Sequence, residues 1–397
     1  KGTAFENHVF LVGGCVRDEI MGLEIKDIDM CVSLQGGGIR FAEWLRDNGY
    51  TTKGVTVYPN YGTAMLHLNE FPEVELEFVQ TRKEKYFDHS CRNPETAFGS
   101  IEDDCMRRDL TINALYTNIS TGEIVDITGK GVDDIKNHII RTPNDPDTIY
   151  DDDPLRILRC IRFASRYGWE IEYDTYEGMV RNVSRLEIIT KERVKDEFCK
   201  MLTCKHPIMA MELLRKIGAM HYVIPELEET YSMTQNEYHF GTVWEHTMMV
   251  LEGTKDDNMI LRISALLHDI GKIRVCTEED GKIHFLKHEL KSGEMIDELL
   301  RPLKFSNEII KEVTFLVRNH MICKTWGSEC EYMKDKKLRR FQYECKTEER
   351  FRNLMTIIDA DNNAYAADKC MPKQVELILS RTEAMKAEGS AMFGYKL

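Results

Sequence analysis

The chain has 397 residues, of which 42% are hydrophobic and 30% are charged, and its formal net charge is −14. This composition is typical of a soluble globular protein with about two to four domains. No apolar run reaches the roughly 18 residues of a membrane span, and no signal-peptide pattern opens the chain. The negative charge argues against a nucleic-acid partner overall, but it does not show where the basic residues lie.

The twelve cysteines are scattered without a CxxC pair, and several lie inside apolar runs. This usage is typical of reduced thiols in a cytoplasmic protein rather than of a disulfide framework or a zinc ribbon. The chain begins at Lys1 instead of Met, so its native N-terminus is expected to lie upstream.

The first dense motif is LVGGCVRDEIMGLEIKDIDMCV, an apolar strand that breaks at Gly13 and Gly14 and a second one that carries Asp27 and Asp29. Alternation along a strand puts both aspartates on one face. Mg²⁺ suits such a pair, because it binds one or two carboxylates together with phosphate oxygens. Glycine backbone N–H groups and Arg17 can hold an anion. The motif therefore predicts a nucleotide and metal site for phosphoryl or nucleotidyl transfer.

The region after this motif has the pattern of a small α/β unit. Residues 39–48 form an amphipathic helical pattern, and residues 63–68 and 74–80 alternate as strands. Glu75 and Glu77 share one face of the second strand. Either can be a third carboxylate beside the aspartate pair, or a solvated edge residue.

A polar stretch rich in turn residues spans residues 82–108, and such a length without regular structure is typical of a functional loop or a disordered one. It leads into CMRRDLTINAL, where Arg107, Arg108 and Asp109 precede an apolar helical stretch containing Asn113. Asp109 can simply be the N-cap of that helix. The cluster can also hold the phosphates and ribose hydroxyls of a nucleotide.

The segment DDDPLRILRCIRFASRYGW predicts a helix with Pro154 in its first turn and aspartates before it. Arginines three and four positions apart line one face, and apolar side chains line the other. Surface salt bridges are the usual explanation of such a stripe. Because no acid is interleaved on the helix body, the stripe also suits polyphosphate or RNA. Its members are Arg156, Arg159, Arg162 and Arg166.

The pattern stays helical up to residue 233, and we expect a neck that joins two functional halves. A second constellation begins at His246 and continues in LRISALLHDIGK, where an apolar helix ends in His268 and Asp269. One imidazole on an apolar face is usually a core histidine, but this His-Asp pair with further ligand types downstream predicts a metal site. Mixed N and O ligands suit Mn, Ni, Fe or Zn, which activate water for phosphoester hydrolysis. The downstream candidates are His288, His320 and Asp359.

A basic segment, KDKKLRR at residues 334–340, stands next to Phe341 and Tyr343. Basic residues beside aromatic ones can bind a nucleic-acid strand, and a solvated loop is the competing interpretation. A charged helical pattern follows at residues 374–387.

Three motifs in this order and at these distances, LVGGCVRD with KDIDM, RRDLTINAL, and DDPLRILRCIRFASR, resemble the class II tRNA nucleotidyltransferases. That family comprises the CCA-adding enzymes and the bacterial-type poly(A) polymerases. The tract at residues 82–109 resembles its flexible catalytic loop, and residues 236–361 resemble an HD phosphohydrolase domain.

The resemblance implies an α+β fold, in which a small N-terminal nucleotidyltransferase α/β head with a mixed sheet precedes an all-α neck and an all-α HD domain. The expected parts are residues 1–142 for the head, 143–235 for the neck, 236–370 for the HD domain and 371–397 for a C-terminal helical tail.

The resemblance also implies roles for single residues. The catalytic carboxylates would be Asp27, Asp29 and Glu77, and the two aspartates would hold Mg²⁺. Gly13, Gly14 and Arg17 would contact the triphosphate. The Arg-Arg-Asp motif with Asn113 would contact the ribose. Asp153 and Arg156 would contact the base. The nucleotide-binding residues would be Gly13, Gly14, Arg17, Arg108, Asp109, Asn113, Asp152, Asp153, Arg156, Arg159 and Arg162. The HD site, with Mn, Ni, Fe or Zn, would use His246, His268, Asp269 and Asp359, with His288 and His320 as further candidates.

The implied reaction is template-independent addition of CMP and AMP, from CTP and ATP, to the 3′ end of tRNA with release of pyrophosphate. The HD domain could add a phosphohydrolase activity. Asp152 and Asp153 stand where many CCA-adding enzymes have Glu-Asp. A poly(A) polymerase or an A-adding enzyme therefore stays an alternative function. An HD phosphohydrolase with a vestigial transferase half and a non-enzymatic RNA-binding scaffold also stay open. Expected partners are tRNA, CTP and ATP, without a membrane or DNA.

Overall fold

The computed structural model describes residues 2–25, 27–59, 62–85, 95–236, 238–239, 241–255, 257–389 and 393. The chain divides into two units, Lys1–Ile189 and Thr190–Leu397. The middle of the expected catalytic loop, residues 86–94, lies outside the described residues. The finer boundaries expected at residues 142 and 235 stay predictions.

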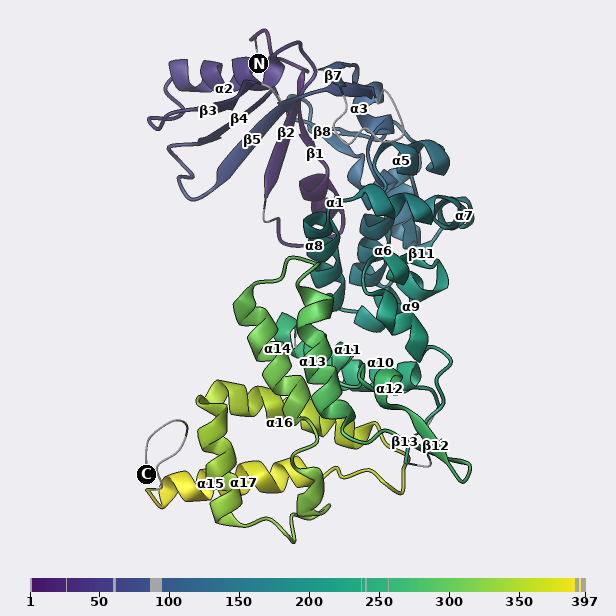
Figure 1. Ribbon diagram of the computed structural model, residues 1–397. Helices are drawn as coiled ribbons and strands as arrows, with labels where there is room; N and C mark the ends of the chain where they lie inside the picture. The colour runs from purple at the N-terminus through teal and green to yellow at the C-terminus, as the bar shows by residue number, and fades with distance from the viewer. Residues whose placement is uncertain are drawn as a thin grey trace. The chain divides into compact units, whose positions relative to one another are not determined.

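The first unit is built on a seven-stranded mixed sheet with the order β3-β4-β5-β2-β1-β8-β9 (Figure 1). β2 and β5 pair parallel, and the remaining neighbours pair antiparallel. The strands are β1 (Val9–Val12), β2 (Ile28–Val32), β3 (Thr56–Tyr58), β4 (Thr63–His67), β5 (Glu75–Gln80), β8 (Tyr116–Asn118) and β9 (Ile124–Val125). The mixed sheet confirms the expected fold of the head.

Helix α2 (Gly37–Asp47) covers one face of this sheet, where it packs against β2, β4 and β5 (Figure 1). Leu76 and Phe78 are buried in the same apolar cluster as Ala42 of α2. Because side chains alternate along a strand, Glu77 points to the opposite face. The helix begins two positions before the predicted residue 39, since Gly36 takes the left-handed conformation (φ 65°) that ends the preceding loop.

The rest of the first unit is mainly helical. A hairpin of β6 (Arg82–Lys85) and β7 (Glu95–Phe98) follows the sheet strand β5, and β10 (Ile139–Ile140) pairs parallel with β11 (Glu170–Ile171). The helices besides α2 are α1 (Gly14–Ile20), α3 (Ile101–Met106), α4 (Gly131–Asn137), α5 (Pro146–Asp152), α6 (Leu155–Tyr167) and α7 (Tyr173–Asn182).

Helix α6 confirms the predicted apolar face, whereas Arg156 of the predicted arginine stripe is buried as well. Its apolar residues Ile157, Leu158, Ile161 and Ala164 are fully buried. Gly168, in the left-handed conformation (φ 72°), ends the helix.

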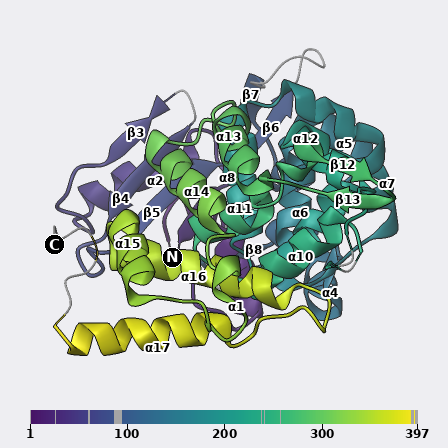
Figure 2. The ribbon, with the colours of Figure 1, turned by 60° about the horizontal axis from the view of Figure 1, so that its bottom comes forward.

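In the part of the second unit that the structure describes, the regular elements are helices and one short hairpin. Helices α13 and α14 lie side by side in both views (Figure 1, Figure 2). The helices are α8 (Lys191–Leu202), α9 (Pro207–Lys216), α10 (Val243–Gly253), α11 (Met259–Leu267), α12 (Lys272–Val275), α13 (His288–Leu300), α14 (Asn307–Asn319), α15 (Asp335–Cys345), α16 (Glu348–Asn363) and α17 (Gln374–Ala387), and the hairpin is β12 (Thr277–Glu279) and β13 (Lys282–His284). Among the helices that the structure describes, not one has the length and apolar character needed to cross a bilayer.

The basic segment at residues 334–340 lies largely within α15, so it is a helix rather than a loop, but most of its basic side chains are exposed as the solvated interpretation expects. Leu338 and Phe341 are buried and hold one face of this helix against the unit. Tyr343 is exposed. The helical pattern predicted at residues 374–387 is confirmed as α17.

Candidate active sites

The sheet brings two of the predicted catalytic carboxylates together. Asp29 of β2 and Glu77 of β5 are direct partners in the parallel register. Glu75 instead lies opposite His67 of β4, beyond the paired part of β2. Asp27 immediately precedes β2 rather than lying in it, because the strand begins at Ile28.

The charges of these carboxylates act on one another. Burial raises the pKa of Asp29, while Arg108 lowers it and Asp27 raises it. Burial also raises the pKa of Glu77, and the negative charge of Asp29 adds to this increase. Mutual repulsion of this kind is relieved by a cation between the oxygens, so the set fits a divalent ion such as Mg²⁺.

A cavity of about 430 Å³ opens beside the two carboxylates. Its wall includes Asp29 and Glu77 together with the arginines Arg82, Arg107 and Arg108. Oxygen ligands for a cation and donors for an anion therefore face the same space, which is what a metal-bound polyphosphate requires.

Arg107 and Arg108 are held in place by Asp104, a fully buried carboxylate of α3. Arg107 Nη2 lies 2.5 Å from Asp104 Oδ1, and Arg108 Nη2 lies 2.8 Å from Oδ2. The Tyr116 hydroxyl also donates to Oδ2 at 2.8 Å. Burial alone would raise the pKa of Asp104, but the two arginines outweigh it and lower this pKa to about 2. Sequence reasoning missed Asp104, although its spacing of three and four from the arginines was a signal.

We expect Asp104→Asn to destabilise the first unit by about 2 kcal/mol at pH 7, the free energy that corresponds to the lowered pKa of Asp104. Because this pKa is lowered, the stabilisation is present above the ordinary aspartate pKa and is lost as the pH falls toward about 2. Urea unfolding of both proteins between pH 7 and pH 2 measures the difference.

The exposed Glu102 of the same helix provides the matched control. Glu102→Gln should unfold like the unmodified chain at every pH. If the loss of unfolding free energy in Asp104→Asn grew as the pH fell, Asp104 would not stabilise the fold through its charge.

Four predicted nucleotide-binding residues form one connected network. Arg17 Nη1 donates to Asn113 Oδ1 at 2.6 Å, and Asn113 Nδ2 donates to Asp109 Oδ1 at 3.1 Å. Arg159 Nη2 lies 2.6 Å from Asp109 Oδ2. The N-cap interpretation of Asp109 is wrong, because the 3₁₀ helix Thr111–Asn113 has Leu110 as its N-cap.

Gly13 lies beside this network at the start of α1. Its backbone conformation (φ 75°, ψ −124°) is one that only glycine adopts readily. A Cβ atom at this position would lie 3.6 Å from Arg108 Nη1. Gly14 is the first residue of α1.

The predicted acid–arginine pair lies at the junction of α5 and α6. Asp153 separates α5 from Pro154, and its Oδ1 accepts a hydrogen bond from the Leu155 amide at 3.1 Å. Arg156 Nη1 lies 3.9 Å from Asp152 Oδ2, and Arg156 Nη2 lies 3.7 Å from Glu84 Oε2 of β6. Sequence reasoning missed Glu84, which carried no signal within the polar loop.

Two arginines of the α6 stripe, Arg156 and Arg159, are therefore paired with acids from other elements. Such salt bridges are the usual explanation of an arginine stripe. Arg162 lies over the Phe163 ring, 4.4 Å from its centroid. Arg17 and Arg159 lie over the same ring at 5.2 and 5.7 Å. Three guanidinium groups thus gather around one aromatic ring.

The second candidate site is a buried cluster of histidines and aspartates in the second unit. His246 of α10 lies with its Nε2 atom 3.1 Å from Asp361 Oδ1 and 3.5 Å from Asp269 Oδ2. His268 Nε2 lies 3.3 Å from Asp269 Oδ2. The ligand atoms of His246, His268 and Asp361 lie within 4.8 Å of one another, so they could hold one metal ion.

The sequence predicted Asp359 as a metal ligand, but the acid that lies among the histidines is Asp361. Both lie on α16, where two positions correspond to a rotation of about 200°, so their side chains point in nearly opposite directions. Burial raises the pKa of Asp359, and the side chains that lower it are Asn363 and Lys255 rather than the histidines. The structure therefore replaces Asp359 by Asp361 in the candidate set.

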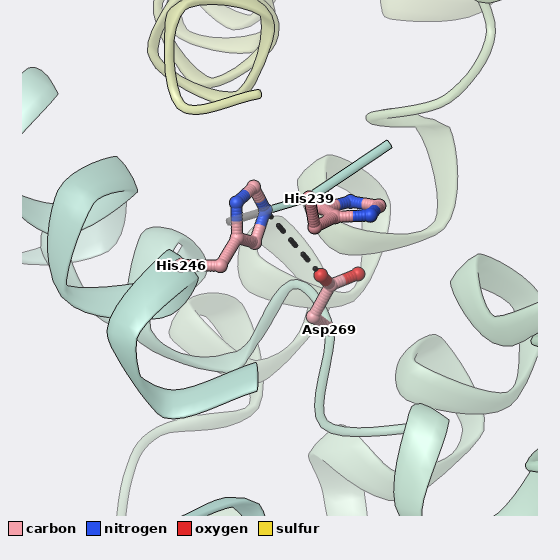
Figure 3. Close-up of side chains that lie close together, drawn as sticks. All are labelled: His239, His246 and Asp269. Carbon is pink, nitrogen blue, oxygen red and sulfur yellow. Dashed lines mark ion pairs between the residues drawn. The ribbon is translucent and has the colours of Figure 1, made fainter. Parts of the chain in front are cut away.

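His239 is a further neighbour that sequence reasoning missed. Figure 3 shows its ring close to His246 and Asp269, and these three residues form another group with metal-ligand spacing. Burial lowers the pKa of His239 to about 3, and the charges of Lys272 and His246 act in the same direction. His239 precedes His246 in the sequence and lies on an irregular segment without a periodic pattern.

Two lysines pair with the carboxylates of the cluster. Lys272 Nζ lies 2.7 Å from Asp269 Oδ2, and Lys324 Nζ lies 2.9 Å from Asp361 Oδ2. Both lysines also line a cavity of about 440 Å³ that reaches His239. His288 and His320 also contact Asp269. Imidazole and carboxylate donors at these distances fit a borderline transition metal.

A mixed sheet with paired carboxylates facing arginines, and a separate His/Asp cluster on helices, define a nucleotidyltransferase head joined to an HD-type domain. Family models match in the same order. The Poly A polymerase head domain matches residues 9–141, the probable RNA and SrmB-binding site of polymerase A matches residues 168–230, and the HD domain matches residues 236–362.

The chain is similar to the multifunctional CCA protein of Actinobacillus pleuropneumoniae, with 32% identity over 79% of this chain and 75% of that protein. It is 35% identical to the mitochondrial CCA tRNA nucleotidyltransferase of Saccharomyces cerevisiae, over 52% of this chain but only 40% of the yeast protein's length. A Bacillus stearothermophilus CCA-adding enzyme solved in complex with CTP has a similar fold, with a TM-score of 0.61 and 19% identity over 96% of this chain and 84% of that one.

The chain belongs to the class II tRNA nucleotidyltransferase and bacterial-type poly(A) polymerase family and carries an HD domain. Members of this family are nucleotidyltransferases, and both kinds of domain imply dependence on divalent metal ions.

Proposed function

We propose that this chain is a CCA-adding tRNA nucleotidyltransferase, which transfers CMP and AMP from CTP and ATP to the 3′ end of tRNA. The pairing of Asp29 with Glu77 in a cavity that also holds Arg107 and Arg108 carries the proposal. The names of the relatives support the choice of tRNA and CTP as substrates, and ATP is part of the proposal. A cytoplasmic location is part of the same proposal and rests on the cysteine usage.

In this proposal Asp27 and Asp29 would hold Mg²⁺, with Glu77 as the third carboxylate, and the ion when bound would lower the barrier to attack by the terminal 3′-hydroxyl on the α-phosphate. Arg17 neutralises the triphosphate and orients the pyrophosphate that leaves in line with the attacking oxygen. The glycines at the start of α1 let the phosphates approach the backbone. The assigned triphosphate contacts are Gly13, Gly14 and Arg17.

The remaining residues select the nucleotide. The network of Asp109 and Asn113, with Arg108 nearby, supplies polar groups for the ribose hydroxyls. Asp153 and Arg156 present hydrogen-bonding groups to the base, with Asp152, Arg159 and Arg162 in support. A site that pairs a base edge penalises the wrong base by leaving buried polar groups unpaired, so no nucleic-acid template is needed.

Incubation with a tRNA that ends before CCA tests this proposal. CTP alone should add cytidine, and CTP with ATP should complete CCA, as read on a sequencing gel with radiolabelled nucleotides. The Asp29→Ala chain, purified in parallel, controls for contaminating host enzyme. Absence of cytidine incorporation would overturn the CCA-adding proposal, and addition of AMP alone would favour an A-adding enzyme or a poly(A) polymerase.

A second activity is supported by the buried His/Asp cluster. We assign to it a transition metal, Mn, Ni, Fe or Zn, which would activate water for phosphoester hydrolysis. His246, His268, Asp269 and Asp361 would be its ligands. Lys272 and Lys324, which line the adjoining cavity, would bind the anionic phosphoryl group.

A further inference from the structure

Phe163 lies on the arginine side of α6 rather than on its apolar side. It follows Arg159 by four positions and Arg156 by seven, which is the spacing of one helical face. The apolar face, which includes Ile157 and Ile161, is fully buried. Phe163 is nevertheless only 5% exposed. A large apolar ring is thus buried on the side of the helix that carries the charges.

Guanidinium groups from two helices lie over this ring. The guanidinium carbon of Arg162 lies 4.4 Å from the ring centroid and that of Arg159 lies 5.7 Å from it. The guanidinium carbon of Arg17, which belongs to α1, lies 5.2 Å from the same centroid. A cation within about 6 Å of an aromatic face is attracted by the ring, most strongly where water is excluded. Phe163 therefore brings side chains of α1 and α6 to one place.

Two of these arginines continue into the network assigned to the nucleotide. Arg17 Nη1 donates to Asn113 Oδ1 at 2.6 Å, and Arg159 Nη2 lies 2.6 Å from Asp109 Oδ2. Asn113 and Asp109 are hydrogen-bonded to each other. The ring of Phe163 closes this chain of contacts into a loop, because it touches the arginine at each end.

Packing alone does not account for the arrangement. Three guanidinium groups repel one another, and Asp18, 2.7 Å from Arg17 Nη2, and Asp109 offset only part of this repulsion. An aliphatic side chain would fill the same space, but it would not attract cations. Tyr167, one turn along α6, adds a second ring 5.7 Å from the Arg17 guanidinium carbon. Aromatic rings are therefore the groups that hold these charges together.

We infer that Phe163 is a positioning residue for the nucleoside triphosphate. Its ring fixes the guanidinium groups of Arg17 and Arg159 before the nucleotide binds. Because arginine side chains have many rotamers, fixing them beforehand reduces the entropy that is lost on binding. The inference rests on the nucleotidyl transfer proposed above and adds a residue that does not itself touch the reacting atoms.

The affinity of the full chain for CTP, measured by equilibrium dialysis with Mg²⁺ and without tRNA, tests this inference. Phe163→Leu should raise the Kd for CTP about tenfold, because the ring is lost and an apolar side chain stays. The rate of CMP incorporation at saturating CTP should change less than about twofold, since the assigned Mg²⁺ ligands are untouched. Phe163→Tyr keeps the ring and should keep the affinity. Phe163→Met is the second ring-free variant, and circular dichroism checks that each variant is folded.

A double-variant comparison shows whether the ring acts through Arg17. Added to Arg17→Met, Phe163→Leu should raise the Kd for CTP by no more than about twofold, because the side chain that it positions is already gone. The matched control is Phe5→Leu, in another buried phenylalanine of the first unit. Phe5 packs against Phe41 and Trp44, with ring centroids 5.0 and 6.2 Å away, and its replacement should leave CTP affinity unchanged.

The outcomes separate this inference from the proposal on which it rests. An unchanged Kd for CTP in folded Phe163→Leu or Phe163→Met would overturn the positioning role and leave the proposed transfer standing. An equal loss of affinity with and without the Arg17 guanidinium, or in Phe5→Leu, would show a general effect on the fold and would also overturn it. Absence of both CTP binding and CMP incorporation in the unmodified chain would overturn the two together.

Discussion

Replacement of Asp29 by alanine is expected to slow nucleotide incorporation into tRNA about a thousandfold, while the chain stays folded. Asp29 lines the cavity from strand β2, where its loss removes an assigned Mg²⁺ ligand and about 4 kcal/mol of transition-state stabilisation. Single-turnover incorporation of CMP at saturating Mg²⁺ measures the chemical step, and urea unfolding measured in parallel reports on the fold.

Strand β5 offers a matched pair of controls for this result. Glu77→Ala should lose most of the activity, because Glu77 is the register partner of Asp29. Glu75→Ala should retain it, because Glu75 is exposed and lies opposite His67. If Glu75→Ala lost as much activity as Glu77→Ala, the assignment of the third carboxylate would be wrong.

Asp361→Asn should reduce metal-dependent phosphoester hydrolysis by the second unit about a hundredfold or more. Asp361 is buried among the histidines and lies 3.1 Å from His246 Nε2, so an amide in its place removes both a negative charge and a ligand. Hydrolysis of bis(p-nitrophenyl) phosphate with added Mn²⁺ or Ni²⁺, and metal content by plasma mass spectrometry, measure the two effects separately.

The neighbouring Asp359 provides the control. Asp359→Asn also replaces an aspartate of α16 by asparagine, but on the side of the helix that faces away from the cluster. Asp359→Asn should keep both the bound metal and the hydrolysis. Retention of both in Asp361→Asn, with loss in Asp359→Asn, would restore the ligand set expected from the sequence.

The local parts of the first site were predictable. Alternating side chains predicted β4 and β5 and put Glu75 and Glu77 on one face, because a strand has a period of two. The choice between these two glutamates depends on how β5 aligns with β2. That alignment is a long-range pairing, which a pattern within one strand does not contain.

Partners across the fold were the part that could not be predicted. The Arg-Arg-Asp motif was recognised, but Asp109 turns out to contact Arg159 of a distant helix. Arg156 similarly lies near Glu84, which belongs to a separate hairpin. Such contacts depend on how helices and strands pack, whereas the spacing of Asp104 from its arginines was visible within one short stretch of sequence.

The second site shows a different kind of limit. His246, His268 and Asp269 were identified because an adjacent His-Asp pair at the end of an apolar helix is unusual. The last acid was misplaced by two positions, since choosing between Asp359 and Asp361 requires the rotational phase of α16 relative to the cluster. His239 lies on an irregular segment, where no periodicity indicates which way a side chain points.

The parallel register of β2 and β5 also determines which changes in chain length the first site can tolerate. Residues 68–74 form a largely exposed connection between β4 and β5, and added or deleted residues there leave the alignment of Asp29 with Glu77 unchanged. One residue inserted between Leu76 and Glu77 would turn the carboxylate of Glu77 toward α2 and the ring of Phe78 toward the cavity. Length variation among natural or engineered versions of this head is therefore expected in the connection and not within the two strands.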